Sequence, residues 1–200
     1  MAVISIVGTS GVGKSFLVKQ LSSLTQNPAF FEGEEGTIPQ DIFESLFKSE
    51  NPIPRWEFFI KKYKNNLEKA HKISKIGMEV FVDGGNLISK AVLSLEKEKY
   101  KPRLLKLIKS IEHLEADKII LLKASKEKIK EFVNNRNRNI ENTNKSLVFN
   151  RSFQIQDELI KLAKNNPNIL VIDRTNLDFS KEKDLQEILN KIKNHKAILI

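Results

Sequence analysis

The stretch GTSGVGKS, from Gly8 to Ser15, decides the fold. It matches the pattern G-x-x-x-x-G-K-[ST] in full, and this pattern describes a phosphate-binding loop that joins a strand to a helix. The apolar run Ala2–Val7 before it predicts a buried strand, and the apolar spacing of Lys14–Leu24 after it predicts a helix. A strand, a glycine-rich loop and a helix in this order indicate a site for a nucleoside triphosphate.

The residue types of this loop match the chemistry of holding phosphate groups. Glycine at positions 8, 11 and 13 lets the backbone turn tightly, so that successive amide groups converge on phosphate oxygens. The Lys14 ammonium is expected to bridge the β- and γ-phosphates, and the Ser15 hydroxyl to ligate Mg²⁺. The start of the following helix adds a partial positive charge. The predicted nucleotide-binding residues of the loop are Gly8, Thr9, Ser10, Gly11, Val12, Gly13, Lys14 and Ser15.

Short apolar runs alternate with longer amphipathic stretches along the rest of the chain, which is typical of a parallel sheet wrapped by helices. This pattern predicts an α/β protein with the three-layer P-loop fold, a five-stranded parallel sheet flanked by helices, in one domain over residues 1–200. The other strands are expected at Ala29–Phe31, Met78–Val82, Lys118–Leu122 and Ile169–Ile172, and Ala197–Ile200 is either a tail or an edge strand. The other helices are expected at Gln40–Lys48, Arg55–Ile73, Asn86–Glu98, Arg103–Leu114, Lys126–Asn135, Leu147–Lys164 and Lys181–Lys193.

The composition excludes several classes of protein. Apolar residues make up 40% and charged residues 30% of the 200 residues, which is ordinary for a folded globular chain. The absence of cysteine excludes disulfides and thiolate metal sites. No apolar run approaches the roughly 18–20 residues that span a bilayer, so we expect a cytoplasmic protein without a membrane partner.

The chain carries a formal net charge of +9, which has two interpretations. Such a charge favours polyanionic partners. However, lysine and glutamate are interspersed along the predicted helices, as on solvated helix faces. The charge alone therefore does not identify a nucleic-acid binder, and no nucleic-acid partner is expected.

The residues around the third strand indicate what happens to the γ-phosphate. A switch GTPase carries a guanine-reading N-K-x-D, which does not occur in this sequence. The third strand ends in VFVDGG, so Asp83 is followed by Gly84 and not by a glutamate that would activate water. Transfer of the phosphoryl group to a bound acceptor is therefore the better interpretation than hydrolysis.

Phosphoryl transfer also needs cations around the transferring group, usually on a lid that excludes water. The polar stretch Asn134–Lys145 supplies Arg136 and Arg138. The sequence thus predicts a lid over residues 126–146, although arginines at the end of a helix can also be ordinary surface residues that interact with the helix dipole.

Taken in order, these landmarks resemble the deoxynucleoside kinases of the P-loop class, especially the small bacterial deoxyadenosine, deoxycytidine and deoxyguanosine kinases. The resemblance runs over most of the chain. Its landmarks are the phosphate loop, Glu32 after the second strand, Asp83 at the end of the third, the R-x-R-x-x-E pattern of Arg136, Arg138 and Glu141, and the segment VIDRTNLDF near the C-terminus.

The resemblance implies an enzyme that uses ATP and Mg²⁺ to phosphorylate the 5′-hydroxyl of a nucleoside or deoxynucleoside. It implies that Glu32 is the general base, with the neighbouring Glu34 and Glu35 as competitors for that role. Asp83 would hold Mg²⁺ through water, and Arg136 and Arg138 would neutralise phosphates in the closed state. Asp173 to Asn176 would line the adenine pocket. A homodimer through the helices of residues 55–114 is a further implication.

Two departures from the family pattern concern the acceptor. Gly84 stands where the family carries arginine, and the helix around Trp56–Tyr63 lacks the glutamine that pairs with the substrate base. The candidates to replace this glutamine are Arg55, Glu57, Lys61 and Asn86. The aromatic set Trp56, Phe58, Phe59 and Tyr63 either stacks on a base or belongs to the core.

Three functions consequently stay open at this point. The first is a kinase that phosphorylates the 5′-hydroxyl of a nucleoside. The second is a kinase for a nucleoside monophosphate, such as thymidylate, or for another small alcohol. The third is a non-catalytic relative that binds ATP.

Overall fold

The computed structural model describes residues 1–33, 38–42, 45, 51–136, 145–164 and 166–195. It contains one five-stranded sheet in which every neighbouring pair of strands is parallel, with the strand order β2-β3-β1-β4-β5. The strands are β1 (Val3–Gly8), β2 (Ala29–Phe30), β3 (Val80–Asp83), β4 (Lys118–Lys123) and β5 (Ile169–Asp173). The predicted α/β fold and each of the five predicted strands are confirmed, with ends that differ by one or two residues.

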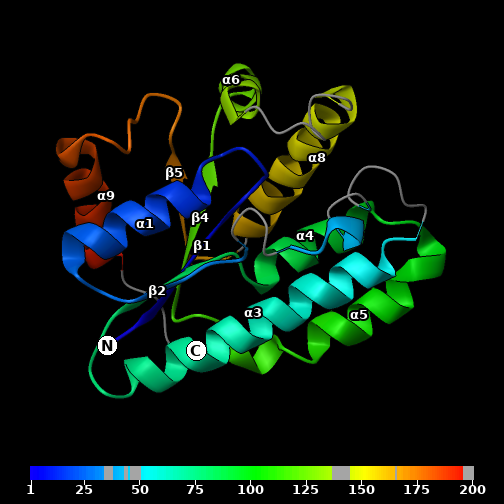
Figure 1. Cartoon of the computed structure of the whole chain (residues 1–200), viewed down its shortest axis with the longest axis horizontal. Helices are drawn as coiled ribbons and strands as arrows, with labels where there is room; N and C mark the ends of the chain where they lie inside the picture. Colours follow the sequence, from blue (N-terminus) through cyan, green and yellow to red (C-terminus); the bar gives the residue numbers. More distant parts are fainter. Residues whose placement is uncertain (34–37, 43–44, 46–50, 137–144, 165, 196–200) are drawn as a thin grey trace.

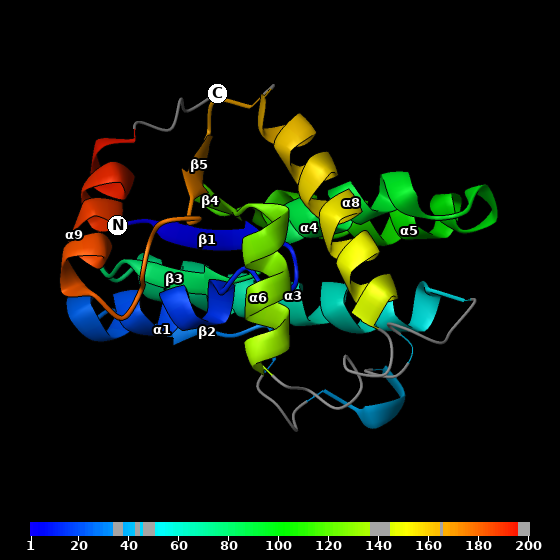
Figure 2. The same ribbon diagram turned by 90° about the horizontal axis from the view of Figure 1, so that it is seen from above.

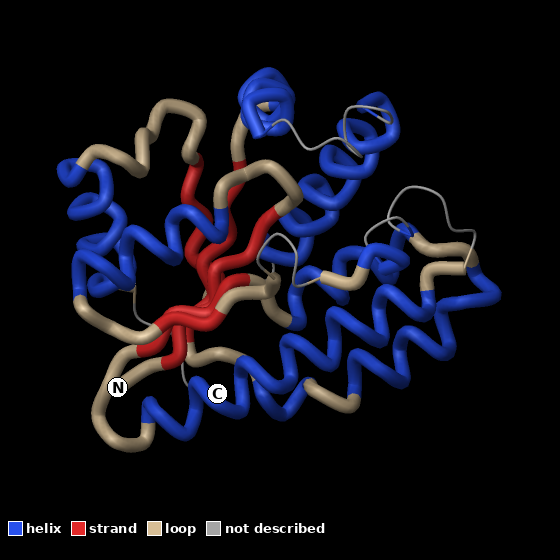
Figure 3. Tube along the Cα trace, in the orientation of Figure 1, coloured by secondary structure: helices blue, strands red, loops and turns tan. Residues whose placement is uncertain are grey.

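The helices form the two outer layers (Figures 1 and 3). Helices α1 and α9 cover one face of the sheet, and α3, α4, α5 and α8 lie on the other. In the view from above, α6 lies across the end toward which the strands run (Figure 2). The bounds are α1 (Lys14–Thr25), α3 (Ile53–Ser74), α4 (Asn86–Leu95), α5 (Lys101–Lys109), α6 (Lys126–Arg136), α8 (Lys145–Lys164) and α9 (Glu182–Asn194).

Two predicted helices end before the expected residue. The helix predicted at Arg103–Leu114 ends at Lys109, and a short 3-10 turn lies at Glu112–Leu114. The helix predicted at Asn86–Glu98 ends at Leu95, and a short 3-10 turn follows at Glu98–Tyr100. Pro102 then lies in the first turn of α5, where a missing backbone N–H costs nothing. The prediction for Gln40–Lys48 is described only in part, and Ala197–Ile200 lies outside the described residues. Within the described ranges, no helix combines the length and apolarity that a membrane span requires.

The central strand β1 explains why the phosphate loop has a fixed base. All six of its residues are buried, and it pairs with β3 on one side and β4 on the other. Such burial on both faces suits an almost continuous apolar strand in a parallel sheet. Its one polar side chain, Ser5, donates from Oγ to the carbonyl oxygen of Gly84 at 2.8 Å. The loop therefore leaves β1 from a rigid position beside the end of β3.

Helix α8 is joined to the sheet by a buried side-chain amide. The Gln156 side chain accepts a hydrogen bond from the Ala124 N–H and donates one to the Ala124 carbonyl, both at 3.0 Å. It thus satisfies both backbone groups of Ala124, directly after β4, as a neighbouring strand would. Buried backbone groups without partners are costly, so this contact ties the helix to the sheet.

We expect Gln156→Leu to lower the free energy of unfolding by about 2–4 kcal/mol, because two buried backbone groups lose their partners. Gln154→Leu is the matched control, since Gln154 is exposed on the same helix. Urea denaturation of both variants measures the difference. Equal stability of the two variants would contradict this account of the contact.

Candidate active site

The phosphate loop follows β1 directly and ends at the first turn of α1. Gly11 and Gly13 have φ values of +82° and +88°, in the left-handed region that favours glycine. A Cβ atom on Gly11 would lie 2.5 Å from Cγ2 of Val133, on α6. A Cβ atom on Gly13 would collide with Nη1 of Arg174. Backbone conformation and lack of space therefore both require glycine at these two positions.

Ser15 and Asp83 meet at the base of the loop. The Ser15 Oγ donates to Oδ2 of Asp83 at 2.5 Å. Oδ1 of Asp83 is buried and has no hydrogen-bond partner among the described residues. Burial raises the pKa of the Asp83 carboxyl, although the nearby Lys14 ammonium and the bond from Ser15 act in the opposite direction.

Ser15 and Asp83 fit a magnesium ion. A hydroxyl and a carboxylate are oxygen ligands of the kind that Mg²⁺ takes, usually together with water and substrate phosphates. The unpartnered Oδ1 of Asp83 is a buried acceptor that such a ligand shell would satisfy. The described residues contain no cluster of three or more acidic or histidine side chains that could hold a metal without the nucleotide.

Glu32 lies directly beside this pair. Its Oε1 accepts a hydrogen bond of 2.5 Å from the Tyr63 hydroxyl, on α3. Asn66, on the same helix, donates from Nδ2 to the Phe31 carbonyl at 2.9 Å and so fixes the backbone before Glu32. Burial raises the pKa of Glu32, the Lys14 ammonium lowers it, and the Asp83 carboxyl raises it. The Lys14 ammonium, which donates to the Thr9 carbonyl at 3.3 Å, thus favours the charged form of both carboxyl groups.

The backbone conformation and surroundings of Gly84 explain why glycine stands where the family carries arginine. Its φ is +86°, and a Cβ atom there would lie 2.7 Å from Cε1 of Tyr63. The Tyr63 ring is almost completely buried in this place. Any side chain at position 84, including the family arginine, would displace the group that holds Glu32. The sequence pattern indicates Tyr63 only as one of an aromatic set, because its contact with Glu32 depends on how α3 packs.

The aromatic set on α3 belongs largely to the core. Trp56, Phe59 and Tyr63 are buried, and their rings follow one another with centroid separations of 6.1 and 6.4 Å. Phe58 is partly buried against the same core and meets Phe59 edge-on. The core interpretation therefore applies to Trp56, Phe59 and Phe58, whereas Tyr63 also has a polar role.

Three of the candidates to replace the family glutamine are placed elsewhere. Glu57 forms an ion pair with Arg103 at 2.5 Å, and Lys61 is exposed. Asn86 is buried and lines a small interior cavity together with Ser5, Leu67 and Ile119. These positions do not bring the three side chains to the carboxylates described above.

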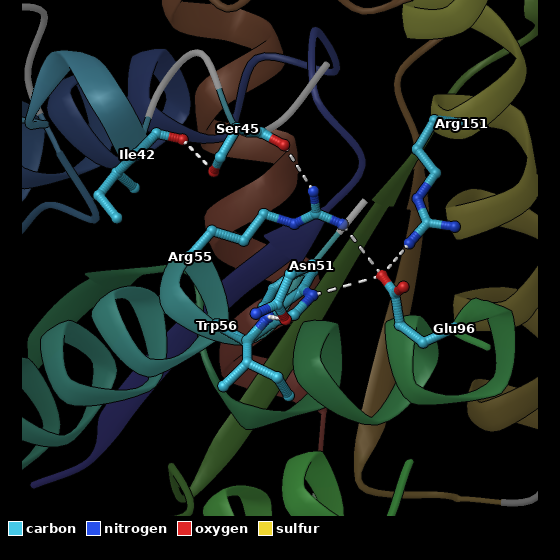
Figure 4. Close-up of polar contacts among 8 residues, drawn as sticks. Ile42, Ser45, Asn51, Arg55, Trp56, Glu96 and Arg151 are labelled. Carbon is cyan, nitrogen blue, oxygen red and sulfur yellow. Dashed lines mark hydrogen bonds and ion pairs between the residues drawn. The ribbon is translucent and has the colours of Figure 1, made fainter. Parts of the chain in front are cut away.

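Arg55, the fourth candidate, belongs to a polar cluster around the Glu96 carboxylate (Figure 4). Oε1 of Glu96 accepts hydrogen bonds from Arg55 Nη2, Trp56 Nε1 and Arg151 Nη2, at 3.2, 3.4 and 2.5 Å. Arg55 Nη1 donates to the Ser45 carbonyl at 2.7 Å. The cluster joins α3, α8 and the end of α4. Both terminal nitrogens of Arg55 already have partners in it, so Arg55 is not available to pair with a substrate base.

The lid residues are only partly described. Arg136 is the last residue of α6, and its side chain lies outside the description, as do Arg138 and Glu141. The competing bases Glu34 and Glu35 also lie outside the described residues. The roles of all five residues stay predictions.

Asp173 is engaged by its neighbours at the end of β5. It forms an ion pair of 2.8 Å with Lys123 and accepts hydrogen bonds from the N–H and hydroxyl of Thr175. Desolvation raises the pKa of Asp173, but the contacts with Lys123 and Thr175 outweigh it and lower the pKa to about 2. The place of Asp173 in an adenine pocket stays a prediction. Recognition of adenine there would depend on the backbone groups of this turn.

Known structures share this fold. Deoxyadenosine kinase from M. mycoides with bound dATP has a TM-score of 0.72 and 18% identity, covering 97% of this chain and 100% of that one. The same enzyme with dCMP and dCDP has a TM-score of 0.67 and 20% identity, with the same coverage. Thymidylate kinase from Candida albicans has a TM-score of 0.63 and 14% identity, covering 100% and 95%.

At the level of sequence, no family model and no curated protein matches the chain. The fold, in contrast, is that of the P-loop kinases, and the resemblance drawn from the motifs is confirmed at that level. Identities of 14–20% fit a divergent chain.

We expect Gly84→Ala to lower the free energy of unfolding by about 1–3 kcal/mol more than Gly77→Ala does. Both glycines have positive φ, at +86° and +91°, so both alanine variants carry the same backbone strain. Only Gly84 has Tyr63 in the way, whereas nothing lies within 4 Å of a Cβ atom on Gly77. Thermal denaturation of both variants tests this, and equal losses would show that the Tyr63 ring is not packed on Gly84.

Proposed function

We propose that this protein is an ATP-dependent kinase that transfers the γ-phosphate to the 5′-hydroxyl of a nucleoside or deoxynucleoside. The observation that carries the proposal is that the Ser15 hydroxyl, from the phosphate loop, contacts the buried Asp83 carboxyl, while Tyr63 holds a second carboxyl group, that of Glu32, beside it. Binding of phosphate by the loop explains the presence of Lys14 and Ser15. Two carboxyl groups in different surroundings support two different chemical roles.

The surroundings divide those roles between Asp83 and Glu32. Asp83 shares a hydrogen bond with Ser15 and keeps one buried oxygen free of partners among the described residues, which suits a position next to Mg²⁺. When bound, the ion would neutralise charge on the β- and γ-phosphates. Glu32 is instead held by a phenol from α3, which suits a base that must point at an acceptor.

The proposed reaction is a single displacement at the γ-phosphorus. The acceptor hydroxyl oxygen forms a bond to phosphorus as the bond to the β-phosphate oxygen breaks, and ADP leaves. Glu32 accepts the proton of the acceptor hydroxyl. Negative charge shifts toward the leaving oxygen during the displacement, and Lys14 stabilises this charge. Arg136 and Arg138 would add positive charge from the lid.

Two further observations support transfer over hydrolysis. Gly84 follows Asp83, so the adjacent position offers no carboxylate to activate water, and it leaves room for Tyr63. In addition, the similar solved structures reported above are, by name, a deoxyadenosine kinase and a thymidylate kinase. The lid over residues 126–146, the single domain, the homodimer and the cytoplasmic location stay predictions from the sequence.

The direct test is to incubate the protein with ATP and Mg²⁺ in the presence of separate deoxynucleosides, ribonucleosides and nucleoside monophosphates. ADP production should depend on a nucleoside, and mass spectrometry should find the product phosphorylated at the 5′-position. Turnover only with a monophosphate would replace the proposal by a nucleotide kinase. ATP binding without turnover on any acceptor would favour the non-catalytic relative. Lys14→Ala is the control, because it removes the phosphate-bridging charge and should abolish activity.

We expect Glu32→Gln to lower kcat by about 10²–10⁴-fold and to change the affinity for ATP little, because a general base acts mainly in the transition state. Glu57→Gln is the matched control, since Glu57, on α3, forms an ion pair with the exposed Arg103, on α5. Steady-state kinetics and calorimetric titration with ATP measure the two quantities. Full activity of Glu32→Gln would assign the proton to another group.

A further inference from the structure

Arg174 is a buried cation in the segment Asp173–Asn176, which is predicted to line the adenine pocket, but no role above is assigned to its side chain. It follows β5, and its backbone N–H donates to the Lys123 carbonyl at 2.9 Å, so the strand pairing continues to this residue. Only 7% of the residue is exposed. Charged side chains are rarely buried to this extent unless they serve a specific contact.

The guanidinium group of Arg174 is held between two aromatic rings. Its Cζ lies 4.0 Å from the ring centroid of Phe132, on α6, and 4.0 Å from that of Phe179, which follows β5. Planar guanidinium groups stack on aromatic faces in this way. The two rings therefore leave the side chain little freedom to turn.

The guanidinium group of Arg174 also contacts the backbone of the phosphate loop. Nη1 donates to the Val12 carbonyl oxygen at 2.8 Å in a buried hydrogen bond. This nitrogen also occupies the space that a side chain at position 13 would need. Because the carbonyl of Val12 points to Arg174, the peptide between Val12 and Gly13 has one fixed orientation, with its N–H on the opposite side.

Burial of this charge is costly, so the arrangement needs compensation. Burial lowers the pKa of Arg174 to about 10, and the nearby Asp178 and Glu131 carboxylates act in the opposite direction. The group is therefore still charged at neutral pH. Its Nε is buried and has no partner within the described ranges. A hydrogen bond from a charged, buried donor is among the stronger contacts that could fix a loop.

We propose that Arg174 is a positioning residue of the phosphate loop, which orients the Val12–Gly13 peptide for phosphate binding and links α6 to the loop through Phe132. The inference rests on the proposed function only in taking this loop as the site that binds the triphosphate. Arg174 acts through the backbone of the loop and not on the phosphates. Its loss should therefore weaken every ligand that uses the loop, whatever base the ligand carries.

The experiment compares MgATP with magnesium tripolyphosphate, which has the phosphates but no base. Calorimetry should show that Arg174→Met lowers the affinity for both ligands by roughly 10- to 100-fold and in parallel, as expected for the loss of a buried charged hydrogen bond. Arg174→Lys keeps the charge without the planar fork and should fall between wild type and Arg174→Met. Arg103→Met is the control, since Arg103 is an exposed arginine paired with Glu57.

Hydrogen–deuterium exchange without ligand is the second readout. Peptides that cover residues 8–15 should exchange faster in Arg174→Met than in wild type, while peptides of β1 and β4 should not change. If Arg174→Met does not fold, Phe132→Leu removes one stacking face only and should show the same pattern with smaller effects.

The outcomes separate the inference from the proposed function. Weaker MgATP binding with unchanged tripolyphosphate binding would overturn the inference, because it would assign Arg174 to the base. Unchanged binding of both ligands, or unchanged exchange in the loop, would overturn it as well. If the wild-type protein binds neither ligand, the proposed function fails, and the exchange measurement still decides whether Arg174 orders the loop.

Discussion

The carboxyl groups of Asp83 and Glu32 interact electrostatically at the base of the phosphate loop, and the arrangement of the site depends on how their charge is compensated. The Lys14 ammonium favours the charged form of both groups, but one positive charge cannot fully compensate two carboxylates removed from water, so each carboxyl group needs a further partner. Asp83 has the Ser15 hydroxyl and Glu32 has the Tyr63 hydroxyl. These two partners come from different helices, α1 and α3. The site can therefore form only when both outer layers of the fold are in place.

The sequence was sufficient to predict the fold, and the positions of the phosphate loop and of Asp83 within it. Buried parallel strands are nearly continuous apolar runs, and each of the five runs chosen is a strand. The phosphate loop could be read directly, because backbone turning and phosphate binding fix its residue types within eight positions. Asp83 could also be located, since the ends of neighbouring parallel strands meet at one edge of the sheet.

The residues that hold this site in place could not be predicted from the sequence. Tyr63 lies 31 positions from Glu32, and Arg174 lies 162 positions from Val12. No local pattern connects residues so far apart, because their contacts depend on the packing of whole helices and of the turn after β5. The sequence shows Gly84 only as the loss of the family arginine, because its contact with the distant Tyr63 also depends on packing. Only the position of the Tyr63 ring shows why a side chain there would be harmful.

Two consecutive residues of α8 face two different parts of the molecule. Ser152 accepts a hydrogen bond of 2.8 Å from the Thr9 hydroxyl, in the phosphate loop. Arg151, one position earlier, binds Glu96 in the cluster with Arg55 and Trp56. A rigid helix transmits any displacement of one residue to the next. A shift of α8 would therefore move the anchor of Thr9 and the Arg151 contact with Glu96 together, so the geometry of the phosphate loop is coupled to that of the Glu96 cluster.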